Sequence, residues 1–391
     1  LATDIRATLL DIAAEEPDAI DPTVVEMIEA AEAGAMSSVA KFQTMLNRVS
    51  ADGRLRGAFV FNGAYQTNRF SSTGAQVHNF PRLVAKEPEV ILALMRQGKP
   101  LDGVLRTLKS MLRPAIKPKG DRVIVRADWN AVEARGLPWL VNSSEARAYM
   151  RAFTDDSRDV YVEQSNAAGL GGERQPGKVV VLSLGYGGAK GALLKMAKNY
   201  GVSIPEPDEV VNRWRRANGW VADKRTGWWA SLHRCSLNTL QGGALRRAGR
   251  VAFSTSGPNL TMTLPSGRVM HYPMAVVVES EYGPQIEYLK ASWKPKADAK
   301  EWPKGRMWHG ILAENATQAV CADLLREALL TCEKRGIEVI GHVHDEIITE
   351  STLSRAPAQG RKLQRAMLAS PTWAAGFPLK AEVDISPRFR K

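Results

Sequence analysis

Two aspartates stand beside stretches of strand-forming residues. Asp128 follows the β-branched run 122–127, and Asp345 lies between the runs 337–343 and 347–350. If these runs pair in one antiparallel sheet, both carboxylates emerge at the same edge. Two carboxylates there would suit a pair of Mg²⁺ ions, which take oxygen ligands and stabilise the attacking and leaving oxygens of a phosphoryl transfer. The alternative for each aspartate alone is a turn former or helix cap, which is the more frequent role.

A second pattern is a spacing of four residues between Arg174, Lys178, Leu182 and Tyr186. On an α-helix each such step turns about 400°, so the four side chains share one face over about 18 Å. Two cations, an aliphatic group and an aromatic ring in this order match the phosphates, sugar and base of a nucleotide. The alternative is a solvated cationic face beside a core stripe, which is more common for an isolated helix.

Two polar segments are weaker signals. His342 and His344 alternate on an expected strand and so share a face, but no Cys or His at zinc spacing accompanies them. The alternative for His344 is a structural contact with the acidic residues that follow it. The loop that contains Arg69 and Ser71, with the segment 78–82 after it, could contact phosphates and sugars, although alone it is an ordinary polar loop.

The elements that must position these residues follow from periodicity and turn signals. We expect helices over 1–48, with a capped start at Asp21-Pro22-Thr23, and over 87–113. Residues 130–250 read as mostly helical and contain Trp139, Trp214, Trp220, Trp228 and Trp229, whereas 251–310 reads as short strands and turns. A helix is expected over 314–334, with Ala319, Ala322, Leu325 and Leu329 on one face.

Composition restricts the class of protein. The chain has 391 residues, with 53 Lys and Arg against 41 Asp and Glu, and its net charge of +12 favours a polyanionic partner. No apolar run reaches the roughly 18 residues of a membrane span. The three cysteines are an odd number without a C-x-x-C pair, which argues against a disulfide framework and fits a reducing cytoplasm. The chain begins with Leu1, which suggests a fragment or a processed product.

In their order along the chain, these motifs resemble those of the family A DNA polymerases, the DNA polymerase I-like group, and particularly its bacteriophage members. The resemblance extends over about residues 40–388 and includes five motifs that are each short. The matching segments are Arg69-Phe-Ser71-Ser72 with Asn79-Phe-Pro81, Asp128-Trp-Asn-Ala-Val-Glu133-Ala-Arg135, Arg174 and Lys178 with Tyr186-Gly187, Gln318 five residues before Asp323, and His344-Asp345-Glu346.

The resemblance implies an α+β right-hand polymerase fold with an antiparallel-sheet palm, a helical fingers insertion and a partial helical thumb. The palm would consist of residues 51–150 and 305–391 and the fingers of residues 151–304. Residues 1–50 would be part of a thumb. A proofreading exonuclease domain or a processivity factor would then lie on a missing region or on another chain.

The resemblance also implies the metal and nucleotide sites. Two Mg²⁺ ions, or Mn²⁺ as a substitute, would bind Asp128, Asp345, Glu346 and the carbonyl of Trp129, lowering the pKa of the primer 3′-hydroxyl and neutralising the triphosphate. Of the dNTP-binding residues, Arg174 and Lys178 would add positive charge at the phosphates, and Lys178 is a candidate proton donor to pyrophosphate. The others would be Glu133, which crowds the 2′ position, Leu182 beside the sugar, and Tyr186 near the nascent base pair.

The DNA partner would be a primer–template duplex, bound with little sequence preference. The residues that the resemblance assigns to it are Arg69, Ser71, Asn79, Gln318 and His344. The chain departs from the family pattern at Leu182, where the family has Phe or Tyr, and at His78 and Asn68, where it has Gln and Gly. We expect Leu182 to alter speed and sugar discrimination, because it packs less area on the sugar than an aromatic ring.

Two alternatives remain open. One is an enzyme of the same fold that uses ribonucleotides or an RNA template. Glu133 argues against the use of ribonucleotides. The other is a catalytically inactive polymerase-like module that binds primer–template DNA. Such a module has no need of a metal pair, so the presence of Asp128 and Asp345 argues against it.

Overall fold

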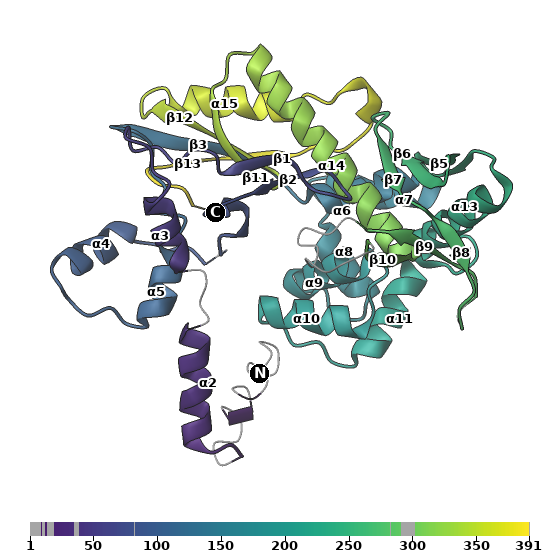
Figure 1. Cartoon of the computed structure of the whole chain (residues 1–391), viewed down its shortest axis with the longest axis horizontal. Coiled ribbons are helices and arrows are strands. Elements are labelled where there is room, and N and C mark those ends of the chain that lie inside the picture. The colour runs from purple at the N-terminus through teal and green to yellow at the C-terminus, as the bar shows by residue number, and fades with distance from the viewer. Residues whose placement is uncertain are drawn as a thin grey trace.

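The structure is a computed structural model of the chain, and it describes residues 9, 12–13, 19–34, 39–81, 83–281, 283–290 and 302–390. Figure 1 shows a long helix and a twisted sheet at the top, with a helical lobe and two small sheets beside and below them. This mixture of helices and antiparallel strands confirms the predicted α+β class. Within the described residues, no helix combines the length and the apolar character of a membrane span.

The sheet that carries both aspartates has four antiparallel strands in the order β11-β12-β3-β13. These strands are β3 (Arg122–Trp129), β11 (Val339–Val343), β12 (Glu346–Thr352) and β13 (Ala381–Ser386). Alternate residues of β3 point to opposite faces of the sheet, as the β-branched run predicts. On one face Ala127 and Trp129 join the main core, and on the other Ile124 packs with Phe389 near the C-terminus.

Two helices cover the core face of this sheet: α14 (His309–Lys334) and α15 (Ala356–Met367). The predicted apolar face of α14 is confirmed, because Ala319, Ala322 and Leu325 are buried and Leu329 packs against the core. The helix begins at His309, five residues before the expected start. Residues 309–313 extend the same buried stripe, since Leu312 and Ala313 are also in the core.

After β3 the chain forms a helical lobe. Its helices are α6 (Val132–Val141), α7 (Ser144–Met150), α8 (Val160–Ala167), α9 (Arg174–Leu184), α10 (Lys190–Tyr200), α11 (Pro207–Ala217), α12 (Gly219–Ala222) and α13 (Trp228–Gly242), with the 3₁₀ turn η2 (Arg151–Phe153). Four of its five tryptophans, all but Trp220, are buried in the main core. The prediction of a mostly helical segment over 130–250 is therefore confirmed.

Two small antiparallel sheets follow, as predicted for residues 251–310. One has the order β4-β5-β6-β7 and the other β10-β9-β8. The strands are β4 (Arg246–Ala248), β5 (Val251–Ser256), β6 (Asn259–Thr263), β7 (Val269–Tyr272), β8 (Val276–Val278), β9 (Gln285–Leu289) and β10 (Lys304–Met307). Residues 151–304 are thus helical only up to Gly242, and the description of this segment as a helical insertion needs that correction.

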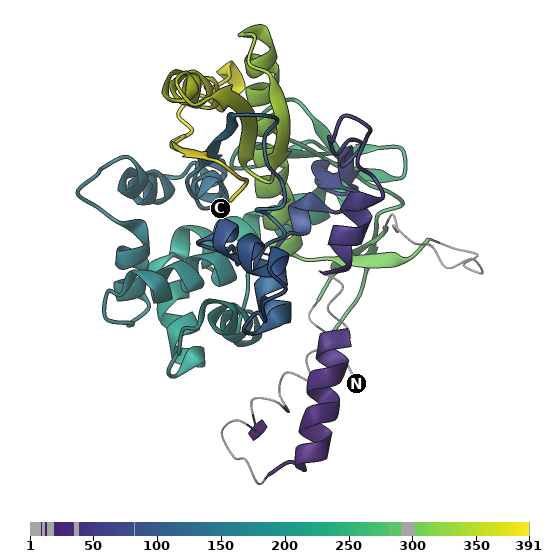
Figure 2. The same cartoon turned by 90° about the vertical axis from the view of Figure 1, so that its left-hand side faces the viewer.

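The N-terminal part contains short helices and a hairpin. Its elements are α2 (Pro22–Gly34), α3 (Ala40–Leu46), β1 (Phe59–Ala64), β2 (Arg69–Ser72), the 3₁₀ turn η1 (Val77–Asn79), α4 (Pro88–Arg96) and α5 (Val104–Ser110). Asp21 caps α2 by accepting a hydrogen bond from the Thr23 N–H at 2.7 Å, as predicted. In both views α2 projects away from the rest of the described chain (Figures 1 and 2).

The single helix expected over 87–113 is wrong. It is divided into α4 and α5, because Gly98 and Gly103 adopt positive φ angles (66° and 51°) and Pro100 between them has no N–H to donate. The C-terminal part beyond α15 contains the 3₁₀ turn η3 (Thr372–Ala374) before β13. The predicted thumb, palm and fingers boundaries stay predictions.

Candidate active site

The sheet brings Asp128 and Asp345 together. Asp128 is the penultimate residue of β3, and Asp345 lies in the two-residue connection between β11 and β12. His344 makes that connection tight by adopting a left-handed conformation with φ of 57°. The backbone N–H of Trp129 then donates to the carbonyl oxygen of Asp345 at 3.1 Å. Two residues far apart in the sequence therefore meet at one end of the sheet, as their positions after β-rich runs predicted.

Two more carboxylates flank Asp128. In the strand register Asp128 lies directly opposite Glu346 of β12 on one side and Glu382 of β13 on the other. Directly opposed residues project from the same face of a sheet. Glu346 is fully buried and accepts a hydrogen bond from Arg126 at 2.8 Å, whereas the exposed Glu382 accepts one from Asn130 at 3.1 Å. Three carboxylates thus stand side by side across three strands.

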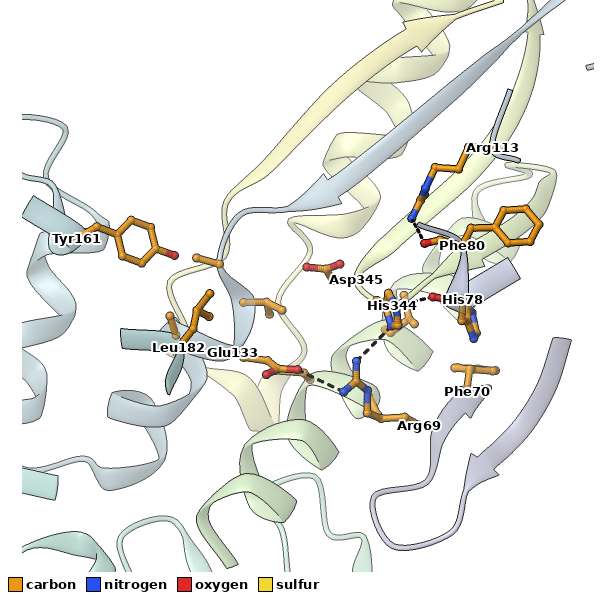
Figure 3. Close-up of a pocket in the computed structure, with 16 residues that line it drawn as sticks. Arg69, Phe70, His78, Phe80, Arg113, Glu133, Tyr161, Leu182, His344 and Asp345 are labelled. Carbon is orange, nitrogen blue, oxygen red and sulfur yellow. Dashed lines mark hydrogen bonds and ion pairs between the residues drawn. The ribbon is translucent and has the colours of Figure 1, made fainter. Parts of the chain in front are cut away.

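A cavity of about 400 Å³ opens beside Asp345. Five predicted site residues line it, namely Arg69, Glu133, Leu182, His344 and Asp345. They come from β2, α6, α9 and the β11–β12 connection, so four distant segments converge (Figure 3). The other lining residues are Phe70, His78, Phe80, Arg113, Ala131, Val132, Ala134, Tyr161, Cys321, Ala322 and Leu325.

Glu133 lines the cavity and contacts two polar side chains, those of Arg69 and Tyr186. It lies in the first turn of α6, where the helix dipole favours a negative charge. Its carboxylate is 3.4 Å from the Arg69 guanidinium and accepts a hydrogen bond from the Tyr186 hydroxyl at 3.3 Å. Burial raises the pKa of Glu133 above its usual value, while the charge of Arg69 opposes that rise. Burial and the neighbouring Glu133 also raise the pKa of the Tyr186 phenol well above its usual range.

Three histidines lie together on another side of the cavity, which His78 and His344 line. His78 lies 5.5 Å, between ring centroids, from both His342 and His344. A ring nitrogen of His78 is 2.9 Å from the carbonyl oxygen of His342, and one of His344 is 2.9 Å from that of His78. Burial lowers the pKa of His78 and of His342 to about 4, so both are neutral at pH 7. His344 therefore has a structural contact, with the backbone of His78, and its contact with DNA stays a prediction.

The helix predicted to present Arg174, Lys178, Leu182 and Tyr186 is present as α9, with Tyr186 two residues beyond its end. Val179, Val180 and Leu184 are buried, which leaves the predicted face partly exposed. Gly177 allows α9 to pack closely on α8, because a Cβ there would lie 1.8 Å from a backbone oxygen of that helix. The sequence pattern therefore predicted the helix and its partly exposed face, whereas what that face binds stays a prediction.

The two cations of α9 do not line the cavity. Arg174 donates to Asp159 at 2.7 Å and lies 5.0 Å from the Tyr161 ring centre. The Lys178 ammonium lies 5.2 Å from the ring centre of Tyr200. Only Leu182 of the predicted face borders the large cavity, and it joins Tyr186 in lining a small cavity of about 50 Å³ behind it. A role of Arg174 and Lys178 with a nucleotide stays a prediction.

The remaining residues predicted for DNA binding lie outside the cavity lining. Ser71 is in β2, and Asn79 ends η1 with its side chain 3.4 Å from that of Gln76. Gln318 lies on α14 and donates to Glu314 at 3.1 Å. These three side chains are at positions that match the family motifs, and their contact with DNA stays a prediction.

Asp323, the acidic residue of the α14 motif, has a structural role. It accepts hydrogen bonds from Arg268 at 2.7 Å, from Ser266 at 2.5 Å and from Arg326 at 2.5 Å. Arg268 and Arg326 also bond to Asn68, the residue before Arg69. Asp323 thereby links α14, the turn before β7 and the β1–β2 hairpin that carries Arg69.

Sequence reasoning missed Tyr161, Arg113 and Arg126. Tyr161 lines the cavity from α8, and no spacing or motif distinguishes it. Arg113 is buried and donates to the carbonyl oxygen of Pro81 at 3.0 Å, which holds the cavity wall. A signal did exist for Arg126, because a residue two positions before Asp128 on a strand must share its face.

The donor set fits Mg²⁺. Within the ranges that the structure describes, no group of three or more His, Cys, Asp or Glu side chains is arranged to hold a metal ion. Mg²⁺, however, usually binds through one or two carboxylates together with substrate phosphates and waters. Asp128 and Asp345 meet that requirement. Asp345 borders the cavity, and the backbone hydrogen bond from Trp129 to Asp345 holds the neighbouring Asp128 beside it. All three cysteines are free and none lies in such a group.

Comparisons with known proteins agree with this geometry. The chain is 26% identical over 385 residues to a DNA polymerase of Bacillus phage SP02, an alignment that covers 95% of this chain and 58% of the phage protein. It also superposes on the structure of the "POL domain of Pol1 from M. smegmatis complex with DNA primer-template and dNTP". The TM-score is 0.57 at 17% identity, covering 93% of this chain and 53% of the other. No protein-family model matches.

The chain therefore has the fold of a Pol1 polymerase domain and is a relative of a phage DNA polymerase, which confirms the resemblance predicted from the motifs. It spans little more than half the length of either protein. The right-hand polymerase fold predicted from the sequence is confirmed by the same comparison.

The stability of the chain relative to a Glu133→Gln variant is expected to fall as the pH rises from 4 to 8. Burial raises the pKa of Glu133 above 4.5, so the folded chain keeps this proton to a higher pH than the unfolded chain does. As the pH rises and this carboxyl ionises, its buried charge opposes folding and the free energy of unfolding falls. Urea unfolding of both proteins at each pH measures the two free energies. A difference that is constant or moves in favour of the wild type would contradict the prediction.

Proposed function

We propose that the chain, as a relative of a phage DNA polymerase with a Pol1-type polymerase fold, is a template-directed DNA polymerase. It would add deoxynucleotides from dNTPs to a primer 3′-hydroxyl and release pyrophosphate. The observation that carries this proposal is the meeting of Asp128 and Asp345 at one end of a sheet, beside a cavity that faces α9. The setting would be phage-type DNA replication in a bacterial cytoplasm.

The reaction forms a bond between the primer O3′ and the α-phosphorus and breaks the bond from that phosphorus to the β-phosphate oxygen. Divalent cations, when bound, would lower the pKa of the 3′-hydroxyl and neutralise the leaving pyrophosphate. Asp128 and Asp345, with the Trp129 carbonyl, are the residues that we propose hold these cations. Their hydrogen-bonded strands position the carboxylates before substrate arrives, which supports catalysis by preorganisation.

The nucleotide would lie along the partly exposed face of α9. Arg174 and Lys178 would meet its phosphates, each exchanging its present contact with Asp159 or Tyr200 for the more highly charged ligand. An ion pair as exposed as that of Arg174 and Asp159 stabilises the fold by at most about 1 kcal/mol, so exchanging it is easy. Rotation of the fingers toward the palm would then select the correct base pair by induced fit.

Glu133, Leu182 and Tyr186 would select the sugar. Leu182 and Glu133 line the same cavity, and the Tyr186 hydroxyl holds the Glu133 carboxylate in place. A carboxylate at the 2′ position crowds a ribose hydroxyl and so favours deoxyribose. Arg69, Ser71, Asn79, Gln318 and His344 would contact the primer–template duplex, for which the net charge of +12 favours binding.

We propose a division into palm, fingers and thumb with the boundaries predicted from the sequence. Residues 51–150 and 305–391 would be the palm, 151–304 the fingers and 1–50 a partial thumb. The chain spans about half of the proteins it matches. The alternative, an inactive module that binds DNA, is tested by the first experiment below.

Asp345→Ala is expected to lower primer extension with dNTPs and Mg²⁺ at least about 1,000-fold, equivalent to about 4 kcal/mol of transition-state stabilisation, because the metal pair loses a ligand. Extension of an end-labelled primer on a DNA template measures the rate. Asp208→Ala, which removes an exposed carboxylate of the fingers, is the control and should extend normally. A wild-type chain that binds primer–template DNA without extending it would establish the inactive module instead.

Glu133→Ala is expected to raise ribonucleotide incorporation about 10-fold or more, which corresponds to about 1.4 kcal/mol of lost discrimination. The change opens space at the 2′ position. Relative kcat/KM for rNTP and dNTP insertion measures the effect. Tyr186→Phe keeps the carboxylate but removes its hydrogen bond, so it should give a smaller change. Unaltered discrimination in Glu133→Ala would show that this residue does not exclude ribose.

Leu182→Phe and Leu182→Tyr are expected to change dideoxynucleotide sensitivity and the insertion rate, because a ring covers more of the sugar than an isobutyl group does. Leu182 lines the cavity directly, so the larger side chains would enter the space proposed for the sugar. Leu194→Phe, at an exposed position on α10, is the matched control. The same dideoxynucleotide inhibition curve for the wild type and both Leu182 variants would reject this role.

A further inference from the structure

The fully buried Glu346 is engaged by an arginine of the neighbouring strand. Arg126 donates to the Glu346 carboxylate at 2.8 Å, and the arginine side chain is only 12% exposed. The same guanidinium lies 3.4 Å from Asp384 of β13, which in turn accepts a hydrogen bond from Arg390 at 3.0 Å. Charges of alternating sign therefore cross the sheet from the buried end of β12 to the chain's C-terminal segment.

The register explains why this arginine is needed. Glu346, Asp128 and Glu382 occupy one row across three strands, and Ile348, Arg126 and Asp384 occupy the next row on the same face. Like charges directly opposite each other destabilise a sheet. An unpaired buried carboxylate is strongly unfavourable, whereas one with a hydrogen-bonded cation is tolerated. Arg126 supplies that cation from the position diagonal to Glu346.

Glu346 and Asp345 are adjacent in sequence but differ in environment. Asp345 borders the cavity, while Glu346 begins β12 and is closed off from solvent. Arg69, an arginine that does line the cavity, is engaged by Glu133 and His344 instead. Of the two carboxylates, that of Asp345 thus borders the cavity, whereas the charge of Glu346 is matched by Arg126 within the sheet.

We propose that Arg126 is a positioning residue that holds Glu346 within the palm sheet, so that Glu346 is a structural counterion and not a ligand of the catalytic cations. This inference rests on the proposed function, and it revises the prediction that Glu346 is a metal ligand. Cation binding would then depend on Asp128 and Asp345, and the Arg126–Glu346 pair would act as a single neutral unit beside them.

The test is Mn²⁺ binding to the whole chain without DNA, measured by electron paramagnetic resonance. Asp128→Asn and Asp345→Asn should each weaken binding at least 10-fold. The double variant Arg126→Gln/Glu346→Gln replaces the pair by a neutral one and should stay within about 3-fold of the wild type. It leaves no unpaired buried charge, so it is also the variant best able to fold, which circular dichroism would verify.

The single variants should move in opposite directions. Arg126→Gln removes a positive charge and releases Glu346, so Mn²⁺ should bind about 10-fold more tightly, and Arg126→Lys should restore the wild-type value. Glu346→Gln leaves the positive charge of Arg126 balanced by Asp384 alone and should weaken binding, an effect that the added Arg126→Gln change reverses. Arg390→Gln, which removes an exposed arginine at the other end of the chain of charges, is the matched control and should change binding less than 2-fold.

Four results would overturn the inference. A double variant that loses as much affinity as Asp345→Asn would make Glu346 a ligand. If Arg390→Gln and Arg126→Gln tightened Mn²⁺ binding equally, the change would reflect only the net charge of the chain. If Arg126→Gln did not tighten Mn²⁺ binding, the proposed role of Arg126 would be wrong. Mn²⁺ binding that is indifferent to both aspartates would instead overturn the metal site of the proposed function itself, and the inference with it.

Discussion

The concentration of negative charge at one end of a buried sheet is the constraint on which the rest of the structure depends. Asp128, Glu346 and Glu382 lie side by side, and Asp345 follows at the adjoining turn. Left uncompensated, these charges would oppose pairing of the three central strands. The fold compensates them unequally, because Arg126 engages the buried Glu346 while the other carboxylates stay near solvent or the cavity. That inequality separates the buried carboxylate that is paired within the sheet from those that lie near solvent or the cavity.

Charge compensation also organises the cavity, where Arg69 contacts the Glu133 carboxylate. Arg69 is held between Glu133 and His344, and so connects the wall formed by α6 to the wall formed by the histidines. The hairpin that carries Arg69 is itself tied to α14 through Asn68 and the cluster around Asp323. Each cavity wall therefore rests on a segment of the chain remote from the others.

How much of the site was predictable differs between its parts. The helix of Arg174 and Lys178 was readable because its spacing of four is a local property of α-helices. The convergence of Asp128 and Asp345 was predicted from strand ends, although the placement of Asp128 within β3 was not. The break between α4 and α5 should have been read from Gly98 and Gly103. Tyr161 could not be predicted, since it reaches the cavity only through the packing of α8 against α9.

By itself, the sequence determined the identity and order of the motifs, the periodicity of α9 and α14, and the excess of positive charge. These are local or summed properties, which need no knowledge of contacts. Only the tertiary structure decided that Glu346 faces Arg126 while Asp345 faces the cavity, because the direction of each side chain depends on strand register. It likewise decided the raised pKa of Glu133, since that shift comes from burial between segments distant in sequence.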